Sequence, residues 1–143
     1  MVFNIFHVYN EVMPANSYVL GRSREHNLLS KLRMNGWFAI RGSGSKAGMV
    51  LVDGKKYFPI DIISVRKEKK KTIVWFIQVS KYLSDIDEIE RKYLVKWAKK
   101  VGAEPVLAWT FEKRRKANPK RGKWEFYNLI SEEYIELSNK NPE

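Results

Sequence analysis

A carboxylate and a polar pair lie on two neighbouring apolar segments of this chain. Asp61 lies within Pro59–Val65. Gln78 and Ser80 end the next apolar segment, Thr72–Ser80, beyond a basic turn. Gln78 and Ser80 point to the same side because strand side chains alternate between faces, and a hairpin of the two segments would bring Asp61 close to both. Acidic residues at these positions would hold a metal ion. Gln78 and Ser80 carry no charge, so the sequence predicts an incomplete metal site.

A glutamate, Glu25, lies near the start of a predicted helix, Ser23–Asn35. The apolar stripe of this helix consists of Leu28, Leu29 and Leu32. Glu25 precedes the first two of these by three and four positions, so it shares their face and is expected to point toward the core or a cleft. A first-turn glutamate that the helix dipole favours is the alternative. That alternative explains its position along the helix but not its inward direction.

A glycine- and serine-rich loop, RGSGSK, follows the predicted strand Trp37–Ile40. It offers flexible backbone N–H groups, the hydroxyls of Ser43 and Ser45, and the cations of Arg41 and Lys46. Such a loop can wrap a phosphate group. Loops of this composition also commonly form only a turn, so the loop alone does not decide between the two.

The chain has a large excess of positive charge. Its 143 residues include 27 Lys and Arg against 16 Asp and Glu, which gives a formal net charge of +11. This excess favours a polyanionic partner, most often a nucleic acid. The alternative is the charged surface of a thermophile protein, but such surfaces balance Lys with Glu and this chain does not. Cys is absent, which excludes a disulfide framework and a thiolate metal site.

A hairpin and a long helix are predicted in the middle of the chain. Asp53-Gly54 is a strong two-residue turn signal between the strands Met49–Val52 and Lys55–Phe58. A helix with Ser84 as its N-cap then continues to Val101, and Gly102 is expected to end it. Its predicted apolar face, at helical spacing, consists of Ile86, Ile89, Tyr93, Trp97 and Val101.

The remaining elements complete the predicted fold. Strands follow at Pro105–Phe111 and Lys123–Leu129, and a short helix at Ser131–Leu137. This order predicts an α/β fold in which a mixed central β-sheet is flanked by helices, one on each side. We expect a single domain over residues 1–143, with an N-terminal extension at 1–20 and a frayed tail at 138–143.

The expected location is the cytoplasm. No apolar run approaches the roughly 18 residues that a membrane helix needs. The first residues, MVFNIFHVYNEVMPAN, lack the basic region with which a signal peptide begins. We therefore expect a soluble intracellular protein that does not contact a membrane.

Taken in order, these features resemble the archaeal Holliday junction resolvases of the PD-(D/E)xK nuclease superfamily. The resemblance covers roughly Gly21 to Leu129 and is closest over Glu25–Lys46, EHNLLSKLRMNGWFAIRGSGSK. There the family also shows a helix with an inward Glu, then Gly-aromatic-Ala, an Arg, and a Gly/Ser-rich loop that ends in a base. The resemblance implies a restriction-endonuclease-like fold and a homodimer that binds a DNA four-way junction or duplex.

The resemblance implies an active site of three acids and a lysine. Glu25 matches the first acid, and Asp61 the second, with one residue between Pro59 and Asp61. Gln78 stands at the third acid and Ser80 at the lysine. Lys81, one residue on, would face the other way unless a bulge turned it back. Loss of one such group commonly costs a factor of about 10² or more in rate, so we expect little turnover, with Glu25 and Asp61 holding Mg²⁺ weakly or not at all.

A second register of the same resemblance is open. It places residues 60–63, IDII, on the strand that carries the third acid and the lysine. The lysine position then becomes Ile63, and the second acid falls near Gly48 or Met49. The first register leaves a more natural distance to the following helix, and the site is incomplete in both.

The sequence leaves three functions open. The preferred one is a resolvase-like protein of DNA recombination or repair that binds DNA through its phosphates and has an inactive nuclease site. The second is an active Mg²⁺-dependent structure-specific endonuclease with a variant site. The third is a regulator that pairs with an active resolvase, suggested by the apolar segment Val2–Tyr9. The candidate phosphate contacts are Arg22, Arg24, Arg41, Ser43, Ser45, Lys46, Lys113, Arg114, Arg115, Lys116, Lys120 and Arg121.

Overall fold

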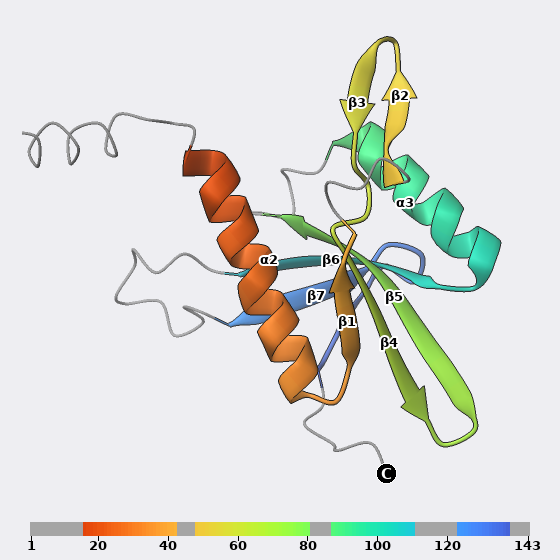
Figure 1. Ribbon diagram of the computed structural model, residues 1–143. Helices are drawn as coiled ribbons and strands as arrows, with labels where there is room; N and C mark the ends of the chain where they lie inside the picture. The colour runs from red at the N-terminus through yellow and green to blue at the C-terminus, as the bar shows by residue number, and fades with distance from the viewer. Residues whose placement is uncertain (1–15, 43–47, 81–86, 111–122, 138–143) are drawn as a thin grey trace, which may run out of the picture.

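The structure of the chain is a computed structural model that describes residues 16–42, 48–80, 87–110 and 123–137 (Figure 1). Its centre is a six-stranded sheet with the strand order β1-β4-β5-β6-β7-β8. The strands of this sheet are β1 (Phe38–Arg41), β4 (Ile62–Glu68), β5 (Lys71–Ser80), β6 (Glu104–Thr110), β7 (Trp124–Asn128) and β8 (Glu133–Ile135). The other described elements are the helices α2 (Asn16–Met34) and α3 (Glu88–Val101) and a separate hairpin of β2 (Val50–Val52) and β3 (Lys55–Tyr57).

β4 and β5 form a long hairpin in the middle of the sheet. Ile62 lies opposite Ile77, and Glu68 opposite Lys71, so the turn consists of Lys69 and Lys70 alone. β5 pairs in parallel with β6 because α3 carries the chain back across the sheet between them. β5 therefore lies in the interior of the sheet, with β4 and β6 as its neighbours.

The two described helices cover opposite faces of the sheet (Figure 1). Residues of β6 alternate between two buried clusters, which places these clusters on opposite faces. The cluster under α2 contains Leu28, Leu32, Trp75, Ile77, Val106, Ala108 and Phe126. The cluster under α3 contains Leu94, Leu107, Trp109 and Leu129. The predicted α/β architecture, a mixed sheet with a helix on each side, is confirmed.

The ends of α3 follow from two residues. The carboxylate of Asp87, the N-cap, accepts hydrogen bonds from the N–H groups of Ile89 and Glu90. Gly102 ends the helix in the left-handed conformation, with φ 75°, as its position in the sequence predicts. The prediction of Ser84 as the N-cap is wrong, because Asp87 takes that role three residues later.

The buried face of α3 differs from the predicted one. The fully buried residues are Leu94 and Ala98, whereas Val101 is 64% exposed. Tyr93 and Trp97 are half-buried beside that face, with their ring centroids 6.1 Å apart. The predicted face, based on the spacing of Tyr93 and Trp97, is therefore one residue away from the observed face of Leu94 and Ala98.

The β2–β3 hairpin is confirmed as predicted. Asp53 and Gly54 form its turn, with φ of 50° and 78°. A two-residue turn with both φ values positive matches the twist of the flanking strands, and Asp-Gly tolerates that backbone better than most residue pairs.

Several predicted boundaries move in the structure. α2 begins at Asn16 rather than Ser23. β4 covers Ile62–Glu68 rather than Pro59–Val65, because Pro59 has no N–H to donate and pairing with β5 runs on to Glu68. Arg66 and Lys67 consequently belong to β4 instead of the turn. Strands β1, β6 and β7 lie within one or two residues of their predictions.

The predicted C-terminal helix at Ser131–Leu137 is wrong. β8, Glu133–Ile135, pairs there with β7. The side-chain oxygen of Asn128 accepts hydrogen bonds from the N–H groups of Ile130 and Ser131, which holds the chain in a turn.

None of the described helices is both long and apolar enough to cross a membrane.

Candidate functional site

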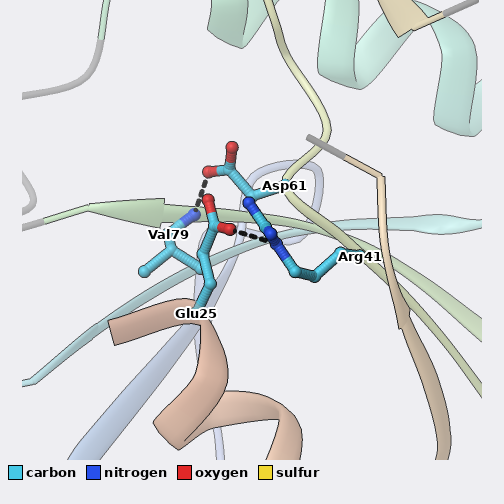
Figure 2. Close-up of polar contacts among 4 residues, drawn as sticks. All are labelled: Glu25, Arg41, Asp61 and Val79. Atoms are coloured by element: carbon cyan, nitrogen blue, oxygen red, sulfur yellow. Dashed lines mark hydrogen bonds and ion pairs between the residues drawn. The ribbon is translucent and has the colours of Figure 1, made fainter. Parts of the chain in front are cut away.

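Asp61 lies immediately before β4, at the end of the sheet where β5 finishes. Its N–H donates to the carbonyl of Ile77 at 2.9 Å. Its carboxylate oxygen Oδ2 accepts from the N–H of Val79 at 2.7 Å (Figure 2). These two bonds hold Asp61 against the end of β5, on either side of Gln78 along that strand.

Glu25 of α2 reaches the same place. It is only 9% exposed, and its Oε2 accepts from Nε of Arg41 at 2.8 Å. Figure 2 shows the side chains of Glu25, Arg41 and Asp61 pointing toward one another from α2, the end of β1 and the start of β4. The predicted inward direction of Glu25 is therefore confirmed, and the fold brings Glu25 and Asp61 together.

Burial changes the charge of Asp61. It raises the pKa of Asp61 from 3.8 to about 8, and the negative charges of Glu25 and Glu90 add to this rise. The hydrogen bond from Val79 and the charge of Arg41 act in the opposite direction but are outweighed. At neutral pH, Asp61 therefore holds a proton.

Gln78 and Ser80 are buried on the other face of β5. They alternate with Ile77 and Val79, which belong to the cluster under α2, so they point toward the side of α3. Nε2 of Gln78 donates to Oε2 of Glu90 at 2.7 Å. The carbonyl oxygen Oε1 of Gln78 is buried and has no hydrogen-bond partner among the described residues. The neutral amide at position 78 is thus bound to a carboxylate from α3.

Glu90 is the residue of this site that sequence reasoning missed. Burial raises its pKa, as does the charge of Asp87, while the hydrogen bond from Gln78 lowers it. Its charge also acts on Asp61, which links the two faces of the sheet at this end. One signal could have found it: Glu90 lies four and eight residues before Leu94 and Ala98, on the buried face of α3.

Most of the candidate phosphate contacts lie outside the described residues. Ser43, Ser45, Lys46, the basic residues of 113–121 and the possible rescue residue Lys81 all fall there. Arg22 belongs to α2, but its side chain is outside the description. Arg24 is half-buried, and Arg41 is half-buried and paired with Glu25. The assignment of these residues to DNA remains a prediction.

A mixed sheet between two helices, with acids from the first helix and from a strand end meeting at its edge, defines a nuclease-like α/β protein of the restriction-endonuclease type. The family model of the archaeal Holliday junction resolvase (Hjc) matches residues 16–138, so the chain belongs to that family.

One solved structure and the curated proteins complete the comparison. The structure is that of Hjc from Archaeoglobus fulgidus, described as a Holliday junction resolvase from an archaeal hyperthermophile. It is 28% identical, with a TM-score of 0.48, over 73% of this chain and 72% of that chain. No curated protein matches the chain significantly.

The family implies a metal-dependent nuclease, and the residues present can be tested against Mg²⁺. This ion takes hard oxygen ligands, normally one or two carboxylates plus waters. Glu25 is paired with Arg41, and Gln78 is neutral and donates to Glu90. Within the described ranges, no three Asp, Glu, His or Cys side chains gather closely enough to hold a metal. These donors do not fit Mg²⁺, so we derive no metal-dependent step from them.

Proposed function

We propose that this chain binds branched or duplex DNA through its phosphate backbone and that its nuclease site is degenerate. Membership of the resolvase family supports the DNA substrate. The formal net charge of +11 supports a contact with phosphates. One observation carries the second half of the proposal: Gln78, which the resemblance aligns with the third acid, is bonded to Glu90 and offers no charge.

The chemistry of the remaining groups supports the same reading. A family nuclease needs a charged cluster that activates water and stabilises the charge that develops on the phosphate. Ser80 cannot supply the positive charge of a lysine at its position. Glu25 is paired with Arg41 at 2.8 Å. The buried site is consequently suited to holding the sheet edge together rather than to attacking a phosphodiester.

A labelled four-way junction and a duplex of the same sequence test the binding. We expect both to bind at low salt, with an affinity that falls steeply as salt rises, because each phosphate contact releases about 0.9 of a counterion. A flat dependence of log affinity on log salt concentration would contradict backbone-directed binding. Failure to bind either DNA at low salt would overturn the proposal.

A second candidate function, an active endonuclease with a variant site, is favoured by one observation. Glu90 places a carboxylate beside Gln78, the residue that the resemblance aligns with the third acid of the family. Incubation of the junction with Mg²⁺ or Mn²⁺ separates the two functions. Symmetric nicks that disappear in both Asp61→Ala and Glu90→Gln would establish the endonuclease. Absence of nicks at protein concentrations that saturate binding supports the degenerate site.

A further inference from the structure

The turn of the β4–β5 hairpin is the most densely charged described part of the molecule. Residues 66–71, RKEKKK, hold five cations and one acid. Lys67, Lys69, Lys70 and Lys71 are all exposed. The one acid, Glu68, lies 3.8 Å from Nε of the buried Arg66 and directly opposite Lys71. We call the four exposed lysines the hairpin tip.

The residues of the β4–β5 turn are not the ones that its backbone conformation favours. Lys69 has a φ of 44° and Lys70 has no positive φ, an arrangement in which Gly is preferred first and Asn second. A side chain other than Gly in left-handed backbone costs of order 1 kcal/mol. The β2–β3 hairpin of the same chain uses Asp-Gly at its own turn. The β4–β5 turn thus departs from local preference and adds like-charge repulsion, which is typical of a functional surface.

The hairpin tip is far from the carboxylates. Asp61 precedes β4, and Lys69 follows its last residue, so eight residues of extended chain separate them. At about 3.3 Å per residue this is roughly 26 Å, the length of about eight base pairs at 3.4 Å each. In Figure 1 the tip projects beyond the sheet, at the end of the molecule opposite to the β2–β3 hairpin.

We infer that the hairpin tip is a phosphate-binding site for duplex DNA that is separate from the end of the sheet where Asp61 lies. The inference rests on the proposed DNA binding and adds a surface to it. The four lysines are exposed point charges on a two-stranded arm, and such charges position a duplex without reading its sequence.

The decisive variant replaces the turn by the pair that its backbone prefers, Lys69→Gly with Lys70→Asn. It removes two charges, and we expect the melting temperature to stay equal or rise because the turn improves. We expect affinity for a 30-base-pair duplex to fall at least about five-fold at low salt and the salt slope to fall by about 2, since each lost phosphate contact lowers it by about 0.9.

The matched control removes two exposed charges from α3, with Lys92→Gln and Lys99→Gln. We expect this control to weaken binding less than two-fold and to leave the salt slope unchanged. An equal loss of DNA affinity in both variants, or no loss in the tip variant, would overturn the inference. The proposed function would still stand in that case, because the wild type binds DNA. A wild type that binds no DNA would instead overturn both.

Discussion

At the scale of single residues, Asp61 combines a functional position with an unfavourable environment. Burial holds its pKa near 8, so folding traps a proton that the unfolded chain would release above about pH 4. A group whose pKa is raised by folding stabilises the native state less as pH rises. Such a residue costs stability at neutral pH, which is common where structure serves a site rather than the core.

Replacing Asp61 by Asn tests this charge. The amide keeps an oxygen that can accept from Val79 but cannot ionise. Between pH 4 and pH 8, the unfolded state has lost the Asp61 proton while the folded state keeps it, so wild-type stability should fall with pH by up to about 1.4 kcal/mol per unit relative to Asp61→Asn. Urea unfolding at pH 5 and pH 7.5 measures the difference. A constant gap between the two proteins across this range would contradict the buried proton.

The pair of Arg41 and Glu25 offers a second test at this scale. Arg41→Ala leaves the nearly buried carboxylate of Glu25 without its partner at 2.8 Å. We expect a loss of about 1–3 kcal/mol in the free energy of unfolding, since removing one member of a buried charged hydrogen bond is costly. The double variant with Glu25→Gln should recover part of that loss. A double variant no more stable than Arg41→Ala alone would mean that the two residues do not act as a pair.

At the scale of elements, Gly102 at the end of α3 allows the cost of backbone strain to be measured apart from side-chain packing. Gly102 has φ 75°, and a Cβ added there would meet no atom within 4 Å. Gly102→Ala should therefore cost about 1 kcal/mol through backbone strain alone. The matched control is Gly48→Ala, where the nearest atom is 3.7 Å away and no positive φ is required. Denaturant unfolding midpoints measure the stability of both variants. Equal midpoints would contradict a cost of backbone strain at Gly102.

The sequence predicted elements where local chemistry and the tertiary fold agree. The Asp53-Gly54 turn and the Gly102 stop carry their own signals, and both are confirmed. The prediction of a helix at Ser131–Leu137 was wrong because the polar composition of this segment does not favour one kind of secondary structure. Pairing with β7 and the turn at Asn128 determine its structure instead. The prediction of the buried face of α3 was wrong because it followed the aromatic residues, whereas Leu94 and the small Ala98 are the residues buried against the sheet.

The site was predictable to the same extent. Glu25 and Asp61 were found from their place beside apolar stripes, and the structure brings them together. Glu90 was missed because it lies on a different element, and its proximity depends on how α3 packs against β5. Contacts of that kind follow from tertiary packing, which a single sequence does not encode locally.

At the scale of the whole molecule, the resolvase family implies a homodimer. Sedimentation at tens of micromolar should then give a mass near twice 16.9 kDa. Two copies would double the cationic surface available to a branched DNA, which raises affinity through multivalency. A mass of one chain at this concentration, and with junction DNA added, would contradict the dimer.

The pairing pattern of the sheet also sets an order of assembly during synthesis. β4 and β5 join residues no more than 15 positions apart, such as Ile62 and Ile77, whereas β5 and β6 join residues 29 apart, such as Trp75 and Glu104. Closing the shorter loop costs less entropy, so the hairpin forms before the parallel crossover. On a ribosome, Asp61 and Gln78 would meet while Glu90 is still being delivered, and the hydrogen bond from Gln78 to Glu90 would form last.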